Sequence, residues 1–506
     1  MKRIISLLIV LSLLCVTTGC SDRNSKGSSN NIENENIGDT IPGTDTDDDN
    51  VDFFITDFGG SKDMGSDRPA EPEILKTYAV STAEYPLIMK EPNFYDFDKD
   101  SDGIWGPEEN EAYFKAEEEW RNQRSTQKNV EGYDQDTGRK SILDFNTRVM
   151  KQFLKENDHE NRIFSPINIY IALGMLAETS EGNTRQQVLD LLGTGNIEEL
   201  RTLVKGLWNR VYTDDKMKSI LASSIWLRDD LSYKKDTLES LAKNYYASSF
   251  SGKMGSDEYS EAFRSWLDHQ TDGILKEQIS GLEFAPETVM ALATTVCFCA
   301  KWQSEFNKNN TKQDIFHSEN GDIQCDFMNI SGTDTYFWGD KFGAINKYFD
   351  RYGSSMMFIL PDEGTSVYDL LTDEQVADFI EKCSEYEQKK NLIVNLSVPK
   401  FDVSSKQDII DDLKELGITD AFDRQKADFS PVSDDPAEIW LDKVEHGVRV
   451  MADEEGVKAA AYTVELLCGD GMPPEETMDF VLDRPFMFVI RSAEGIPLFV
   501  GIVERP

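Results

Sequence analysis

Histidine is scarce in this sequence, and the few copies present form no catalytic pattern. The chain has 506 residues and four histidines, none of them in an H-E-x-x-H motif. No G-x-S-x-G segment is present, so the sequence offers no nucleophile motif of a hydrolase. We therefore expect a protein that is not an enzyme and that requires no cofactor.

Cysteine is also sparse and irregularly spaced. Of the seven cysteines, two lie within the first 20 residues. The other five form no C-x-x-C pair and no even set; they are Cys297, Cys299, Cys325, Cys383 and Cys468. A disulfide framework and a zinc site of the usual spacing are not indicated, so a hydrophobic core must stabilise the fold.

Basic residues are outnumbered by acidic ones. The 52 Lys and Arg residues face 93 Asp and Glu residues, which gives a formal net charge of −41. Such a chain repels the phosphates of a nucleic acid, so we expect no nucleic-acid partner. We also expect a monomer.

The N-terminus has the pattern of a bacterial export signal. Two basic residues precede the apolar stretch 4–16, which is too short to span a bilayer. The stretch ends in V-T-T-G-C at 16–20, which resembles a lipobox with Thr17 where Leu is more usual. That resemblance implies a signal over 1–19, lipidation of Cys20, and a membrane anchor at the bacterial cell surface. The alternative is ordinary secretory cleavage nearby, with Cys20 incidental.

Composition divides the rest of the chain into three parts. Residues 20–85 are rich in small polar and acidic residues and predict a flexible stalk. Residues 86–136 are acidic with scattered aromatics. From residue 137 to 506, apolar residues recur first at helical spacing and later in continuous runs such as 486–490, which predicts one α+β domain.

One loop in the acidic segment has the spacing of an EF-hand calcium site. Residues 98–109 read D-K-D-S-D-G-I-W-G-P-E-E. The pattern supplies oxygens at loop positions 1, 3, 5, 7 and 12 and a glycine at the sharp turn, as a hard cation requires. The predicted calcium ligands are the side chains of Asp98, Asp100, Asp102 and Glu109 and the carbonyl of Ile104. An Asp-rich turn without metal is the alternative, and no second loop is present to pair with this one.

Segments of residues 137–506 resemble the signatures of the serpin family, in the family's order. They are I-F-S-P at 163–166, E-G-N-T at 181–184, the strand 296–302 with Phe306, V-P-K-F at 398–401, A-D-F-S at 427–430, D-R-P-F at 483–486 and F-V-G-I-V at 499–503. The resemblance implies a serpin fold with about three β-sheets, eight or nine helices and an exposed reactive-centre loop. It also implies a suicide-substrate inhibitor of serine, and by extension cysteine, proteases, which inserts its cleaved loop into the central sheet.

The segment 444–463 resembles the serpin strand and hinge that open the reactive loop, here about 456–478. A loop that becomes a central strand must offer an N–H at every position, and residues 457–472 contain no proline. Its entering end is small and flexible. The predicted hinge residues are Glu454, Gly456, Val457, Ala459, Ala460 and Ala461. The alternative is an alanine-rich surface helix.

The region where a serpin sheet opens is matched by Ser165, Trp302 and His446. Other positions depart from the family pattern, because Thr294 replaces an Asn and Asn168 replaces a Ser. Cys297 and Cys299 also stand at two core positions where the family has small residues. We expect these departures to change the free energy needed to open the sheet, and to leave the fold unchanged.

The position of the cut within the loop stays open. Counting from Gly456 by the usual family length places it between Asp470 and Gly471. The loop is slightly longer than in common relatives, so cleavage at Leu466, Leu467, Cys468 or Met472 is the alternative.

Two other functions stay open beside inhibition. A non-inhibitory serpin would act as a binding protein or chaperone. The calcium-like segment would fit a calcium-dependent surface-assembly protein.

Overall fold

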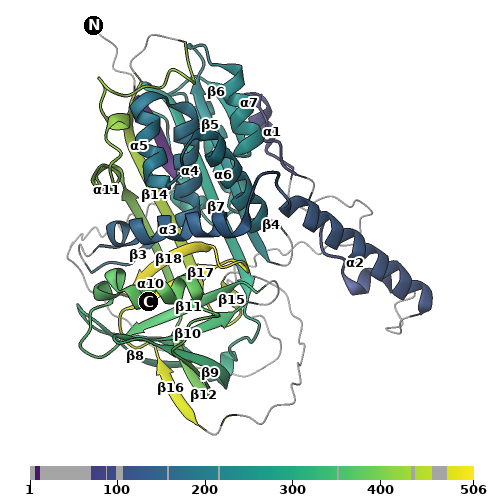
Figure 1. The fold of residues 1–506 in the computed structure, drawn as a ribbon, viewed down its shortest axis with the longest axis vertical. Helices are drawn as coiled ribbons and strands as arrows, with labels where there is room; N and C mark the ends of the chain where they lie inside the picture. The colour runs from purple at the N-terminus through teal and green to yellow at the C-terminus, as the bar shows by residue number, and fades with distance from the viewer. Residues whose placement is uncertain are drawn as a thin grey trace, which may run out of the picture.

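The computed structural model describes residues 6–11, 70–86, 88–98, 106–155, 159–214, 217–349, 353–434, 439–457, 474 and 476–506. These residues form two β-sheets with helices, so the predicted α+β class is confirmed (Figure 1). Of the helices in the described part, eight have seven or more residues, in agreement with the expected number. None of the described helices is long and apolar enough to cross a membrane.

The long helices of the domain lie mainly in its first half. They are α3 (Gln135–Phe153), α4 (Pro166–Thr179), α5 (Gly182–Leu192), α6 (Ile197–Val211), α7 (Lys235–Asn244) and α8 (Asp257–Gln270), with α10 (Glu374–Lys382) further on. Side chains cap the N-termini of most of them, as Ser165 does for α4 and Asn196 for α6. Every residue of α4 is buried, so this helix is an internal support for the sheet beside it.

The first sheet carries the site described below. Its hydrogen-bonded order is β1 (Ser6–Leu11), β14 (Leu441–Ala452), β15 (Gly456–Val457), β7 (Thr288–Lys301), β5 (Lys218–Arg228), β6 (Ala247–Gly252) and β2 (Ala79–Ser81). Two further strands pair at its sides, β13 (Phe401–Asp408) with β14 and β4 (Thr213–Asp214) with β5. β7 and β5 read as near-continuous apolar runs because both of their faces are covered.

The second set of strands has two parts, which are connected by β9 (Gly321–Trp338) alone. The order is β16 (Thr477–Val481), β12 (Lys389–Pro399), β9, β10 (Phe342–Tyr348), β11 (Ser355–Pro361), β17 (Phe486–Arg491), β18 (Pro497–Val503) and β3 (Arg162–Phe164), with β8 (Lys312–Ser318) on β9. β9 pairs with β12 over residues 327–337, but with β10 only over its last three residues. The expected count of about three sheets thus corresponds to two hydrogen-bonded sets, the second of which spans two parts joined by β9.

The N-terminal boundaries drawn from the sequence differ from the structure. Within the predicted stalk, α1 (Glu73–Lys76) and β2 dock on the body, where Leu75 is buried and β2 adds an edge strand to β6. The apolar and aromatic residues of this short stretch bury enough surface to order it, which the overall polar composition concealed. Tyr85 stacks on Trp208 and Tyr246 at the end of the stretch.

The helix α2 (Pro107–Lys128) projects from the body (Figure 1) and has no buried residue. Its base is attached, because Lys128 forms an ion pair with Glu494 and the ring of Tyr133 lies against Gly138 and Gly206. A Cβ at Gly206 would come within 1.9 Å of that ring. Residues before 137 thus contact the body of the protein.

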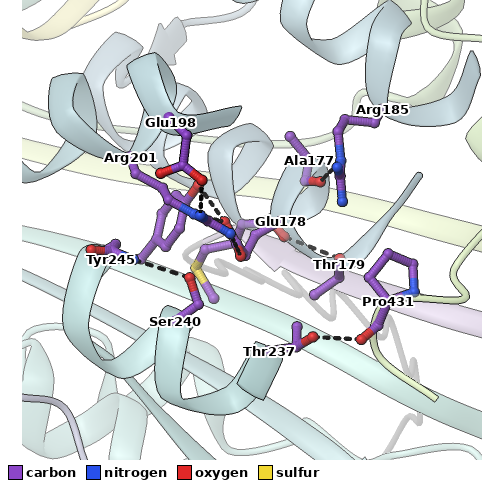
Figure 2. Close-up of polar contacts among 12 residues, drawn as sticks. Ala177, Glu178, Thr179, Arg185, Glu198, Arg201, Thr237, Ser240, Tyr245 and Pro431 are labelled. Atoms are coloured by element: carbon purple, nitrogen blue, oxygen red, sulfur yellow. Dashed lines mark hydrogen bonds and ion pairs between the residues drawn. The ribbon is translucent and has the colours of Figure 1, made fainter. Parts of the chain in front are cut away.

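A buried ion pair fixes α4 to its neighbours (Figure 2). The Glu178 carboxylate, 4% exposed, accepts two hydrogen bonds from the Arg201 guanidinium at 2.8 and 2.6 Å and one from the Tyr245 hydroxyl at 3.2 Å. Both oxygens are thereby satisfied, as burial of a carboxylate requires. Burial raises the pKa of Tyr245 well above its ordinary value, so its hydroxyl stays a donor.

Candidate loop-insertion site

A slot one strand wide separates β7 and β14. The two strands run parallel, and within the described residues they form no ladder with each other. At one end β1 pairs with both, at Ile9 with Val444 and with Leu292. At the other end the two-residue strand β15 pairs antiparallel with both. A strand that enters the slot therefore finds backbone partners on both sides.

The expected signal segment contributes the strand at the first end. Residues 6–11 lie within the predicted signal 1–19, yet here they form β1 between β14 and β7. Isoleucine, leucine and valine favour extended backbone, and two facing strand edges offer unmade hydrogen bonds. The slot accepts an apolar strand of the chain itself.

Between β1 and β15 the slot is hollow. A cavity of about 40 Å³ lies beside residues 447–451 of β14 and 296–298 of β7. It is lined mostly by apolar side chains, among them Val296, Phe298, Val448, Val450, Val457 and Ile490. Such a lining suits the inward side chains of a further strand.

The hinge enters the slot at the end opposite β1. Gly456 pairs with Lys301, and Val457 pairs with Ala300 on one side and Ala452 on the other. Val457 is 4% exposed and lines the cavity. Gly456 is required by close approach, since a Cβ there would lie 2.2 Å from the carbonyl oxygen of Ala300.

The turn 302–306 holds the base of the hinge, residues 453–455, through three N–H donors. The Trp302 backbone donates to the Glu455 carbonyl at 3.0 Å, and its indole donates to the Asp453 carbonyl at 2.9 Å. The Phe306 backbone donates to the Glu454 carbonyl at 2.9 Å. Trp302 is 2% exposed, as befits the centre of this contact.

Glu454 anchors the same base through its side chain. Its carboxylate accepts a hydrogen bond from Thr311 at 2.8 Å and pairs with the Lys400 ammonium at 3.0 Å. Burial alone would raise the pKa of the Glu454 carboxyl, but these two partners outweigh burial and hold it below its ordinary value. The carboxylate is therefore ionised at neutral pH.

Ser165 and His446, two of the residues that match the family's sheet-opening region, meet midway along the slot. The Ser165 backbone N–H donates to Nε2 of His446 at 3.1 Å. Burial lowers the pKa of His446 to about 3, so the imidazole is neutral and can accept this bond. The two positions that depart from the family pattern also meet, because the Asn168 amide donates to the Thr294 carbonyl at 3.4 Å.

Other predicted residues lie outside the described part of the chain. They are the hinge alanines Ala459, Ala460 and Ala461, the cleavage candidates Leu466, Leu467, Cys468, Asp470, Gly471 and Met472, the calcium ligands Asp100, Asp102 and Ile104, and the lipidation site Cys20. Of the calcium set, Asp98 and Glu109 are described. The Glu109 carboxylate caps α2 by accepting the Gly106 N–H at 2.8 Å. Within the described ranges, no three His, Cys, Asp or Glu side chains are placed to hold a metal ion.

Sequence reasoning missed the partners of the hinge base. Lys400 lies in the V-P-K-F segment, whose pattern does not point to the hinge, and Thr311 carries no local signal. Their contacts join segments far apart in the chain, Glu454 being 143 residues from Thr311. Spacing along one segment cannot reveal such pairs.

Comparison with known proteins agrees with this geometry. Residues 140–506 match the family model of the serpins, described as serine protease inhibitors. An uncharacterised serpin-like protein of Methanosarcina acetivorans is 26% identical over 361 residues, 70% of this chain and 84% of that protein. Serpin-Z7 of Hordeum vulgare is 28% identical over 369 residues, 69% of this chain and 91% of its own length.

A solved structure shows the same fold. The crystal structure of a thermophilic serpin, tengpin, in the native state superposes with a TM-score of 0.66 at 28% identity, covering 75% of this chain and 96% of that chain. The family match covers well over half of the sequence and includes the slot, the hinge base and the opening region. This chain belongs to the serpin family.

Proposed function

We propose that this serpin inhibits proteases by inserting its cleaved reactive loop between β7 and β14. The observation that carries the proposal is the slot itself, which already holds Gly456 and Val457 and is hollow beyond them. A sheet with no gap would have to break a ladder before a strand could enter. Here the entry requires no such step at the cavity.

The proposed mechanism uses the unmade hydrogen bonds of the slot as its driving force. A protease attacks the loop and forms an acyl-enzyme, and the freed segment after Val457 then extends β15 down the slot. Each new ladder bond contributes about 0.5–1.5 kcal/mol net, and burial of inward side chains adds to it. Insertion that outpaces deacylation carries the protease away from its original position and traps it.

The test is a panel of serine and cysteine proteases followed by a denaturing gel. The account predicts a covalent band at the summed mass of inhibitor and protease. Simple cleavage of the loop with free protease throughout the panel would favour the non-inhibitory serpin instead. Sequencing the new N-terminus identifies the cut, which we place between Asp470 and Gly471.

We further propose that lipidation of Cys20 anchors the protein at the surface of a bacterial cell. Processing before Cys20 would remove residues 6–11, and with them β1, so the mature protein would have the whole slot free for the loop. Metabolic labelling with a fatty acid tests this, with Cys20→Ser as the variant that should lose both label and membrane association. Equal labelling of both proteins would refute the anchor.

We also propose one calcium ion at residues 98–109, at the tip of the projecting helix α2. Because Glu109 also caps α2, the informative variant is Asp100→Ala with Asp102→Ala, which leaves the cap intact. Calorimetry should give calcium heat for the parent protein and none for the variant. If calcium changed the yield of the covalent complex in the parent, the calcium segment would act on inhibition rather than on surface assembly.

A further inference from the structure

Lys347 is a buried charge beside the turn that grips the hinge. It lies on β10 and is 7% exposed. Its Nζ donates to the Ser304 carbonyl at 2.7 Å and lies 4.5 Å from the ring centre of Phe306 and 5.4 Å from that of Trp302. The turn 302–306 thus contacts Lys347 through one carbonyl and two ring faces, and the hinge base through three N–H groups.

The surroundings compensate this ammonium only in part. An ammonium has three N–H donors, and ring faces are weaker partners than oxygens. Asp334 on β9 is the charged group that acts on Lys347, and burial outweighs it, so that the pKa of Lys347 falls to about 8. The other charged groups of the neighbouring segments have partners of their own: Glu305 pairs with Lys301, Glu454 with Lys400, Glu455 with Lys308, and the Asp453 carboxylate accepts backbone N–H groups.

We infer that Lys347 is a positioning residue for loop insertion, whose buried ammonium makes the turn 302–306 easier to displace from the hinge base. The inference rests on the proposed function, because insertion requires the sheet to open where the hinge enters. A poorly compensated ammonium regains water when the turn moves aside, so its charge favours the open arrangement.

The sign of the pH dependence follows from proton linkage. The closed site binds the Lys347 proton less tightly than water-exposed lysine does. Opening is therefore easiest below about pH 8, where Lys347 is charged in both arrangements. It becomes harder as the pH rises from about 8 towards the ordinary lysine value of 10.5, because the closed site then holds a neutral amine.

Two variants with fixed charge and one matched control test the inference. Lys347→Met is neutral at every pH, Lys347→Arg is charged at every pH, and Lys312→Met removes an exposed lysine on β8. The readout is the number of inhibitor molecules consumed for each protease molecule trapped, measured at pH 7 and at pH 9.5. At each pH the value for a variant is divided by the value for the parent, so that the pH dependence of the protease cancels.

At pH 7 we expect Lys347→Met to consume at least threefold more inhibitor than the parent, and the difference between the two to be smaller at pH 9.5. At pH 7, Lys347→Arg and the control Lys312→Met should consume as much inhibitor as the parent does. At pH 9.5 Lys347→Arg should consume less than the parent. Equal consumption by the parent and Lys347→Met at pH 7, or a difference between them at pH 9.5 as large as at pH 7, would overturn the inference.

Hydrogen exchange separates this inference from the proposed function. At pH 7 the amides of 302–306 and 453–457 should exchange at least threefold more slowly in Lys347→Met than in the parent, whether or not any protease is trapped. Equal exchange would overturn the role of Lys347 while leaving inhibition intact. Absence of a covalent complex from the parent would overturn the proposed function while the exchange comparison still decides the role of Lys347.

Discussion

At the scale of single residues, Glu454 links the hinge to two distant segments. Its carboxylate is 5% exposed, bonds Thr311 and Lys400, and has a pKa below the ordinary value of 4.5. A depressed carboxyl pKa stabilises the native state above the unfolded pKa, and this stabilisation is lost as the pH falls through the native pKa. Glu454 thus makes the hinge base acid-sensitive.

We predict that Glu454→Gln lowers the free energy of unfolding by about 1–3 kcal/mol at pH 7, because Lys400 loses its ionic partner. The difference from the parent should shrink as the pH is lowered from about 5 to 3, measured by denaturant titration at each pH. Glu455→Gln is the matched control, since Glu455 pairs with the exposed Lys308. Parallel curves for parent and Glu454→Gln across this range would contradict the assignment.

At the scale of elements, the ring of Tyr133 joins the Lys128–Glu494 ion pair in holding the base of α2. Tyr133 fits between α3 and α6 only because residues 138 and 206 are glycines. We predict that Gly206→Ala expels the ring and detaches the base of α2, seen as faster proteolysis of residues 107–133 with an unchanged core. The control is Gly332→Ala, on β9, where a Cβ meets no atom within 4 Å. Equal proteolysis of both variants would show that the ring does not fix the helix.

The hinge makes a second prediction at this scale. Val457 is buried in the slot, so alternation along a strand predicts that Ala459 will face inward once the loop inserts. Ala459→Arg should slow insertion by burying a charge and turn most of the protein from inhibitor into substrate, which a denaturing gel measures as loss of the covalent band. Lys458→Arg, at an outward position, should keep the band. Equal bands for both variants would refute the inward register.

The elements also show what sequence patterns could and could not predict. The apolar strands β17 and β18, the buried helix α4 and the hinge at Gly456 followed from periodicity or from the serpin resemblance. The docking of β2 did not, because three residues of edge strand in a polar segment give no periodic signal. The pairing of β1 with β7 and β14 depends on an open slot formed by strands about 280 and 430 residues away in the chain, a spacing that no local pattern contains.

At the scale of the whole molecule, the slot between β7 and β14 holds β1 at one end, Gly456 and Val457 at the other, and a cavity between them. The buried ion pair on α4, the Ser165–His446 contact and the Glu454 anchor hold the surrounding elements in that arrangement. Under the proposed function, the native state is less stable than the state with the loop inserted, and cleavage of the loop removes the barrier between them. Metastability is a property of the whole sheet, which no single residue determines.

The most direct test of loop insertion compares thermal melts of the intact protein and of the protein cleaved once between residues 466 and 472. Nicking an exposed loop ordinarily leaves a domain unchanged or weakens it. Insertion instead adds a central strand, with about 0.5–1.5 kcal/mol for each hydrogen bond and further gain from apolar burial, so the cleaved protein should melt far above the intact one. Coincident melting of the two forms would contradict insertion of the loop between β7 and β14.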